Sequence, residues 1–138
     1  MTLKYLLDTN VVSEPLLPEP APGILRGIRR HEGEMTILSI VWHVLQFCCL
    51  RLPKSRRRTA IERYLQYVVL ASLPILDYDR AAAEWHALER ARLAALGRTP
   101  PFIDGQIAAI ARVNDLALVT SNKADFAGFK GLRLASWT

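Results

Sequence analysis

Short apolar runs alternate with longer helical patterns along this chain of 138 residues, and this alternation limits the fold more than any other feature. The runs do not alternate cleanly between apolar and polar residues, which is typical of strands covered on both faces. Strands separated by helices predict a parallel sheet, because parallel neighbours need crossover connections. The sequence therefore predicts an α/β fold with a parallel sheet of four to five strands flanked by helices. The predicted strands are residues 3–7, 35–39, 73–76, 116–119 and a short last strand at 132–134.

Capping and breaking residues place helices between these strands. The predicted helices cover residues 21–31, residues 40–51, a segment after Ser55, a segment from Asp79 to near Gly97 that carries Trp85, Leu88 and Leu96 at helical spacing, and about 101–113. The segment 40–51 is almost entirely apolar, so we expect that helix to be deeply buried. The helical pair after the second strand is longer than a crossover requires, and this makes it a candidate arm or partner-binding surface.

The length is that of one ordinary domain, here predicted to span residues 1–138, with enough residues to bury a core. We find neither a secretory leader nor an apolar run long enough to cross a bilayer, so we expect a cytoplasmic protein. Cys48 and Cys49 are adjacent, which suits neither a disulfide framework nor spaced zinc ligands. We interpret both as buried packing residues.

The net charge of +5 is concentrated in one segment, residues 51–63, which holds six bases against the single acid Glu62. The bases are Arg51, Lys54, Arg56, Arg57, Arg58 and Arg63. Such a patch can attract phosphate chains by counterion release. A solvated helix face or a surface for an acidic protein partner explains it equally well. All three interpretations stay open at this stage.

Three aspartates, Asp8, Asp104 and Asp125, each stand where an apolar stretch meets a turn or a helix start. Taken singly, they could be turn formers, caps or first-turn residues. In a parallel sheet, however, the ends of the first and fourth strands and the start of a following helix can converge on one edge. Carboxylate oxygens are the ligands that Mg²⁺ prefers. We therefore predict a magnesium site suited to phosphodiester chemistry, and expect Asp8→Asn or Asp104→Asn to stabilise the metal-free protein.

Other chemistries have less support in the sequence. Its three histidines are far apart and lack metal-ligand spacing, so they are interpreted as surface or core residues. They are His31, His43 and His86. The glycine-rich signatures of dinucleotide and phosphate-loop sites do not occur.

With these residues in view, the chain resembles the PIN-domain ribonucleases, and among them the VapC-type toxins of bacterial toxin–antitoxin pairs. The resemblance covers nearly the whole length and depends on four stretches in order. They are LLDTNVVSE at 6–14, LRLP at 50–53, DGQIAAIA at 104–111 and TSNKADF at 120–126.

The resemblance implies a PIN-like domain with an acidic Mg²⁺ or Mn²⁺ site that cleaves single-stranded RNA and is neutralised by a VapB-type antitoxin. It also implies a homodimer and contact with operator DNA through the antitoxin. By match, Asp8 and Asp104 would be the principal metal ligands, and Asp125 a further acidic member of the catalytic site. The supporting hydrogen-bonding residues would be Thr9, Asn10, Thr120 and Asn122.

The sequence departs from the family pattern at Val44, where a glutamate is usual in the helix after the second strand. A valine side chain cannot bind a metal ion. One interpretation is a ribonuclease with reduced activity, carried by the three aspartates. The other is a weakened or inactive toxin-fold protein that binds an antitoxin within an operator-binding complex. A nuclease for DNA flaps or structured RNA is a third alternative, which the small size of the chain disfavours.

Overall fold

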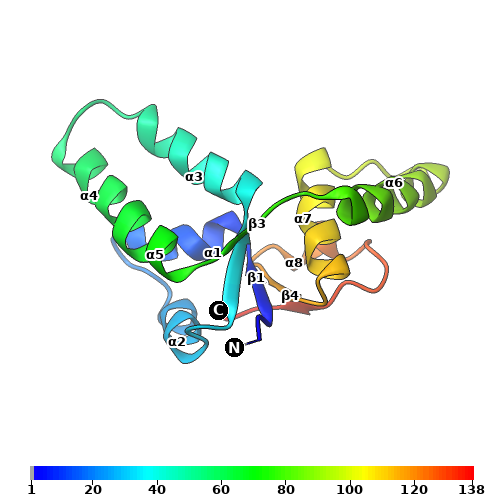
Figure 1. Ribbon diagram of the computed structural model, residues 1–138, viewed down its shortest axis with the longest axis horizontal. Coiled ribbons are helices and arrows are strands. Elements are labelled where there is room, and N and C mark those ends of the chain that lie inside the picture. The colour runs from blue at the N-terminus through cyan, green and yellow to red at the C-terminus, as the bar shows by residue number, and fades with distance from the viewer. Residues whose placement is uncertain (1) are drawn as a thin grey trace.

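The apolar runs become five parallel strands of one sheet in the computed structural model, which describes residues 2–138 (Figure 1). The strands are β1 (Tyr5–Leu7), β2 (Met35–Leu38), β3 (Ile75–Leu76), β4 (Ala117–Val119) and β5 (Leu134–Ala135). Their order across the sheet is β3-β2-β1-β4-β5, and every neighbouring pair is parallel. The predicted α/β fold and all five predicted strands are confirmed, with boundaries shifted by one to two residues.

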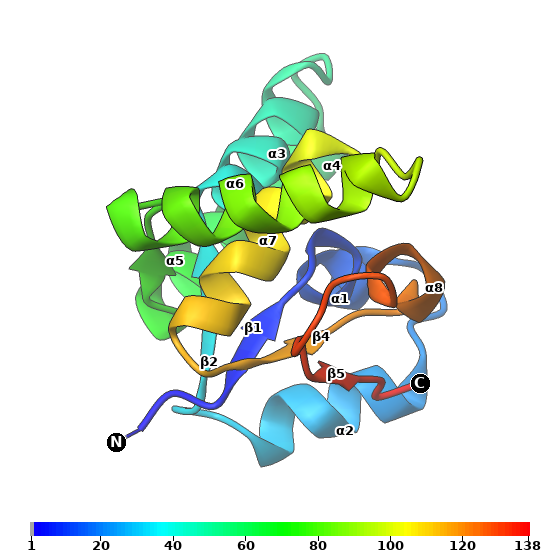
Figure 2. The ribbon, with the colours of Figure 1, turned by 90° about the vertical axis from the view of Figure 1, so that its right-hand side faces the viewer.

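Helices cover both faces of this sheet. They are α1 (Thr9–Ser13), α2 (Pro22–Arg30), α3 (Ser39–Leu50), α4 (Arg56–Tyr64), α5 (Leu70–Ser72), α6 (Arg80–Ala95), α7 (Phe102–Val113) and α8 (Lys123–Phe126), with the short 3₁₀ turn η1 (Glu14–Leu16) and the π-helical turn η2 (Leu65–Val69). Figures 1 and 2 place α2 on one side of the sheet and α7 on the other, with α6 packed outside α7. Within residues 2–138, no helix has both the length and the apolar character needed to cross a membrane.

The helical pair predicted after the second strand is present as an arm of α3, α4, η2 and α5 (Figure 1). The Ser55 side chain caps α4 by accepting a hydrogen bond from the backbone N–H of Arg58 at 3.2 Å, as predicted. The arm is fastened to the sheet layer by Tyr64, whose hydroxyl donates to the backbone oxygen of Val12 at 2.6 Å. Burial raises the pKa of Tyr64 to about 12, so this phenol remains a hydrogen-bond donor at physiological pH.

Two predictions about burial are wrong. Helix α3 is not deeply buried: its buried residues are Val41, Leu45 and Cys49, whereas Phe47 is 57% exposed. Of the two cysteines predicted to be buried packing residues, Cys49 is buried and Cys48 is exposed. The physical reason is that α3 leaves the sheet edge as part of the arm, so only one stripe of it meets the core.

The predicted helix α6 is present, but the leucines at helical spacing do not lie on its inner face. Leu88 and Leu96 are exposed, and the buried positions are taken by small, polar or charged residues as well as by an aliphatic one. They are Ala82, His86, Glu89 and Leu93. Glu89 can be buried because it accepts hydrogen bonds from Arg92 and from the backbone N–H of Lys130 at 3.0 Å.

The sheet reverses its direction of growth beside β1. The chain adds β2 and β3 on one side of β1, and then crosses to add β4 and β5 on the other. In open parallel sheets, ligands bind outside the carboxyl ends of the strands at such a switch point. Here that point lies between β1 and β4, whose register pairs Leu7 with Val119. The next residues along the two strands therefore define where a functional site is expected.

Candidate active site at the carboxyl edge of the sheet

Asp8 is the first residue after β1 and is held by hydrogen bonds to both carboxylate oxygens. Its Oδ1 accepts from the backbone N–H of Thr9 at 2.8 Å, which makes Asp8 the N-cap of α1. Its Oδ2 accepts from the hydroxyl of Thr120 at 2.9 Å. The side chain is only 8% exposed, so these two donors offset much of the cost of burying the charge.

Thr120 is the matching first residue after β4, and it connects Asp8 to the turn before α8. The residue is buried, and its hydroxyl oxygen also accepts from the backbone N–H of Asn122 at 3.0 Å. The side chains of Asn10 and Asn122 are exposed and make no hydrogen bond within residues 2–138. Of the four predicted supporting residues, Thr120 therefore contacts Asp8 through its side chain and Thr9 through its backbone.

Asp104 approaches the same edge from the first turn of α7 and is half-buried. In contrast to Asp8, its carboxylate has no hydrogen-bond partner within the described residues. Burial raises the pKa of Asp104, and the negative charges of Asp125 and then Asp8 raise it further. The charges of Asp125 and Asp8 therefore reach Asp104, although the three residues are far apart in the sequence.

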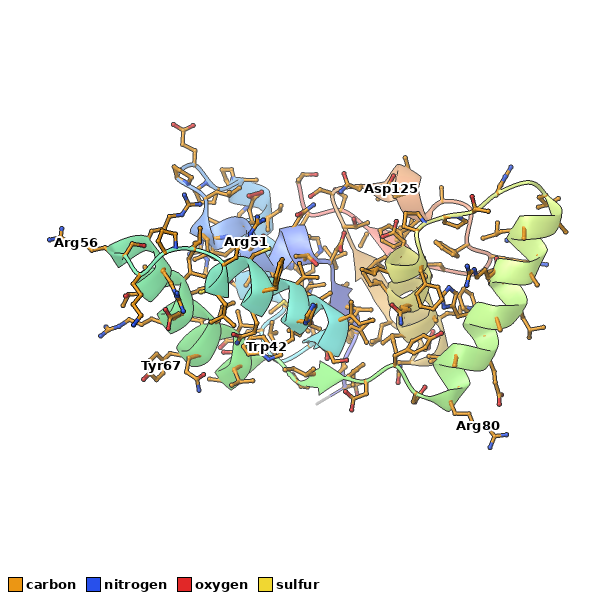
Figure 3. All side chains as sticks on the ribbon, turned by 90° about the horizontal axis from the view of Figure 1, so that it is seen from above. Trp42, Arg51, Arg56, Tyr67, Arg80 and Asp125 are labelled. Carbon is orange, nitrogen blue, oxygen red and sulfur yellow. The ribbon has the colours of Figure 1, made fainter. Side chains whose placement is uncertain are left out.

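Asp125 lies in the first turn of the short helix α8 and is exposed. It lines a hollow of about 500 Å³ that also contains Arg98 and Thr99 from the segment between α6 and α7. Viewed from above, Asp125 lies across the molecule from the arm (Figure 3). Asp125 is therefore the solvent-facing member of the three.

The position of α7 depends on a contact that the sequence did not reveal. His86 of α6 is 4% exposed, and its Nδ1 is hydrogen-bonded to the hydroxyl of Tyr78 at 2.9 Å. A Cβ atom built on Gly105 would lie 2.1 Å from Nε2 of His86, so the imidazole fits only against a glycine. Because Gly105 follows Asp104 directly, this packing fixes the turn that carries the carboxylate. Burial, and next the charge of Arg90, lower the pKa of His86, which favours the neutral ring.

The third side of the edge is formed by α3, which begins directly after β2. Val44 is half-buried there, between the buried residues Val41 and Leu45. Its side chain offers no oxygen to a cation. On the neighbouring turn η1, one carboxylate oxygen of Glu14, Oε2, is buried without a hydrogen-bond partner among the described residues.

The residues at this edge can be tested for their fit to a metal ion. The donors are all carboxylate oxygens, and a hard cation such as Mg²⁺ needs only one or two of these beside water and a substrate phosphate. A compact group of three or more His, Cys, Asp or Glu residues that could hold an ion does not occur within residues 2–138. The donor chemistry therefore fits Mg²⁺ through one or two carboxylates, and the predicted three-aspartate ligand set remains a prediction.

Comparison with known proteins adds independent information. The family model "PIN domain" matches residues 5–132. The chain is 32% identical over 137 residues to the tRNA(fMet)-specific endonuclease VapC of Shigella flexneri, covering 99% of each chain. It is 32% identical over 136 residues to ribonuclease VapC2 of Haemophilus influenzae, covering 98% of each. Among solved structures, DNA-bound VapBC from Salmonella typhimurium superposes with a TM-score of 0.81 at 28% identity, covering 99% of both chains.

Proposed function

The chain belongs to the PIN-domain family and is of the VapC type, and from that premise we propose that it is a divalent-metal-dependent endoribonuclease that cleaves single-stranded RNA. The observation that carries the proposal is the position of Asp8, which is held by Thr120 at the switch point between β1 and β4. The pKa of Asp104, raised by burial and then by the charges of Asp125 and Asp8, supports it. Carboxylates held together in this way repel one another unless a cation or protons neutralise them. The relatives named as ribonucleases share this chain length and 32% identity.

In this proposal Asp8 and Asp104 hold Mg²⁺ or Mn²⁺, and Asp125 acts as the further acidic group. When bound, such an ion positions the scissile phosphate, acidifies a water molecule and offsets charge on the leaving oxygen. Thr120 and the backbone N–H of Thr9 each donate to one oxygen of Asp8, which restrains the rotamer and leaves a further lone pair on each oxygen. Asp104 has no such restraint within the described residues, so it can adjust to the substrate.

The proposal includes a protein partner. Several similar solved structures are toxin–antitoxin complexes, some of them bound to DNA. We infer that this chain is likewise neutralised by a VapB-type antitoxin, pairs as a homodimer and reaches operator DNA through the antitoxin. The exposed apolar residues of the arm, including Phe47 and Leu70, are consistent with a surface that a partner covers.

A second candidate function is favoured by one observation, the valine at position 44 of α3. If a glutamate is needed there for catalysis, the chain is a weakened or inactive toxin-fold protein that retains only antitoxin binding. The two candidates differ in whether the purified chain cuts RNA.

The deciding experiment is a gel assay on fluorescently labelled single-stranded RNA with Mn²⁺, with EDTA, and with Mn²⁺ plus the antitoxin. We expect fragments in the first condition alone, and a loss of at least about 100-fold in rate for Asp104→Asn, because removing a metal ligand removes transition-state stabilisation. Lys123→Gln, an exposed change on the neighbouring helix α8, serves as a control that should keep the activity. Cleavage that persists in EDTA would rule out the metal-dependent mechanism, and no cleavage together with tight antitoxin binding would favour the second candidate.

A further inference from the structure

The six bases of residues 51–63 are not equivalent in the structure. Arg58 is 20% exposed and has structural partners: it donates to the backbone oxygen of Leu52 at 3.0 Å and to the carboxylate of Glu62 at 3.1 Å. Arg51 lies over the ring of Phe47, with its guanidinium carbon 5.9 Å from the centroid. The remaining bases form no ion pair within residues 2–138, and they are Lys54, Arg56, Arg57 and Arg63.

The position of two of these free bases is unfavourable for the folded state. Arg56 and Arg57 are the first two residues of α4, and its first turn contains no acidic residue. The amino end of a helix carries partial positive charge, so cations there are repelled by the helix and by one another. Folding therefore gains nothing from these charges, whereas a bound anion would be stabilised by them.

The surface beside the free arginines is hollowed. A shallow depression of about 510 Å³ is lined by Ser55, Arg56, Thr59, Ala60 and Arg63. It adjoins a second hollow of about 340 Å³, because Thr59 and Arg63 line both. The two hollows therefore lie next to each other along α4 and η2, with Thr59 and Arg63 between them.

The second hollow contains an exposed aromatic ring and an amide. Tyr67 is 74% exposed, and it lines the second hollow together with Gln66. Both residues lie in the π-helical turn η2, a feature that is frequent at functional sites. Figure 3 shows Arg56 and Tyr67 projecting outwards from the arm, on the opposite side of the molecule from Asp125.

From this combination we propose that the two adjoining hollows along α4 and η2, defined here as the arm groove, bind single-stranded RNA at a distance from the scissile phosphate. Arg56 and Arg63, which line the groove, contact phosphates, as does Arg57 from the neighbouring position on α4. Tyr67 stacks on an unpaired base. The inference rests on the proposed ribonuclease function for the identity of the substrate. A row of free cations that ends at an exposed aromatic ring is the arrangement by which proteins hold single strands.

An acidic protein segment would satisfy the cations equally well, but RNA accounts for more of the groove. The free cations would bind a polyanion, and the exposed ring and amide would bind planar groups that stack and form hydrogen bonds. The only acid that lines the groove, Glu62, is already paired with Arg58. The charge complementarity of the groove is therefore to a continuous chain of phosphates.

The location of the arm groove gives a specific expectation about substrate length. During cleavage, only an RNA that extends from the carboxylates to the arm can also occupy the groove, so the groove should favour cleavage of long RNA and leave cleavage of short oligonucleotides unaffected. In steady-state kinetics this is a change in KM for the long substrate, with kcat unchanged, because the arginines do not touch the reacting atoms.

The test compares the triple variant Arg56→Gln, Arg57→Gln, Arg63→Gln with a charge-matched control, Lys4→Gln, Arg80→Gln, Arg133→Gln. The control removes three exposed cations that lie outside both hollows. Binding of a 30-nucleotide single-stranded RNA is measured in EDTA as a function of salt, and cleavage of this RNA and of a 6-nucleotide RNA is measured in Mn²⁺. We expect the arm variant to bind the long RNA at least about tenfold more weakly, and its plot of log affinity against log salt to lose a slope of about 2, at roughly 0.7 per phosphate contact. The control should keep the slope, and cleavage of the short RNA should not distinguish the proteins.

A second pair of variants keeps the test informative if the triple variant does not fold. Tyr67→Ala should weaken binding of the long RNA several-fold, and Tyr67→Phe should retain it, since stacking needs the ring and not the hydroxyl. Equal affinities for the arm variant and its control, or for the two Tyr67 variants, would overturn the inference. So would a loss of antitoxin binding with RNA binding intact.

Because binding is measured in EDTA, the two proposals can fail separately. Arginine-dependent RNA binding without cleavage in Mn²⁺ would remove the proposed function and leave the arm groove standing. Cleavage with no dependence on the arm arginines would remove the arm groove and leave the proposed function standing.

Discussion

Asp8 and Asp104 both lie at the carboxyl edge of the sheet, but their surroundings differ. Asp8 emerges from a central strand, and both of its oxygens accept hydrogen bonds, from the backbone of Thr9 and from Thr120. Asp104 stands on the first turn of a helix, has no hydrogen-bond partner within the described residues, and has a raised pKa. The strand side of the site is thus complete in the free protein. The helix side carries electrostatic repulsion that a bound cation would relieve.

The largest effect should come from changing the third side of the site. Val44→Glu adds a carboxylate to α3, the helix that forms the third side of the edge where Asp8 lies. We expect the rate of Mn²⁺-dependent RNA cleavage to rise by about 10- to 100-fold, the range by which groups that orient ligands and water change activity at metal sites. Val44→Gln, of nearly equal size and without charge, is the matched control. Equal rates for Val44→Glu and the wild type would mean that position 44 is not the missing acidic position.

The helix side can be displaced without touching a carboxylate. Gly105→Ala places a Cβ atom 2.1 Å from the imidazole of His86, so α6 or α7 must shift. We expect a loss of about 1–3 kcal/mol in the free energy of unfolding, typical of overpacking, and a fall in RNA cleavage. Thermal unfolding and the gel assay measure the two effects.

The control for this change is a double variant, His86→Ala with Gly105→Ala. Removing the imidazole removes the clash, so the double variant should be more stable than the sum of the two single changes predicts. Simple additivity would show that the contact between His86 and Gly105 does not position α7.

Matched substitutions of the two aspartates bear directly on the comparison. In EDTA, Asp104→Asn should raise the free energy of unfolding by up to about 1 kcal/mol, because it removes repulsion among carboxylates that solvent partly screens. Asp8→Asn should lower it by about 1–3 kcal/mol, because an amide N–H would face one of the two donors that Asp8 now satisfies. The sequence alone gave the same sign for both. Chemical denaturation distinguishes the cases, and stabilisation by both changes would show that the hydrogen bonds of Asp8 do not offset its repulsion.

Much of the fold follows from the sequence, because each strand and helix is marked by local signals. The apolar runs gave the parallel sheet, and Ser55 and Asp79 marked the amino ends of α4 and α6. The sequence predicted less well which side chains of each helix are buried. Phe47 in α3 and Leu88 in α6 have apolar side chains that remain exposed, since composition does not say which helix face the rest of the chain covers.

The site, too, contains features that the sequence predicts and features that it does not. Asp8, Asp104 and Asp125 could be selected from the sequence, because parallel strands bring their carboxyl ends to one edge. The hydrogen bond from Thr120 to Asp8 spans 112 positions along the chain, and the resemblance to the family indicated only that Thr120 is a supporting residue. The contact of His86 with Gly105 depends on how two helices cross. A glycine in the first turn of an otherwise apolar helix was its only signal in the sequence.

The smallest expected effect concerns pH, and it compares the same two aspartates in the metal-free protein. A carboxyl group whose pKa is raised on folding binds more protons in the native state than in the unfolded state. Its contribution to stability therefore falls as pH rises from the ordinary aspartate value through the raised pKa of Asp104. The lowered pKa values of Glu34 and Glu89 act in the opposite direction, since their contribution to stability is lost as pH falls through the folded values.

The stability difference between the wild type and Asp104→Asn isolates the contribution of Asp104. We expect this difference, measured in EDTA, to shrink as pH is lowered through that window, because protonated Asp104 no longer repels Asp125 and Asp8. A difference that is constant with pH would mean that Asp104 titrates normally and that the helix side of the site carries no more repulsion than the strand side.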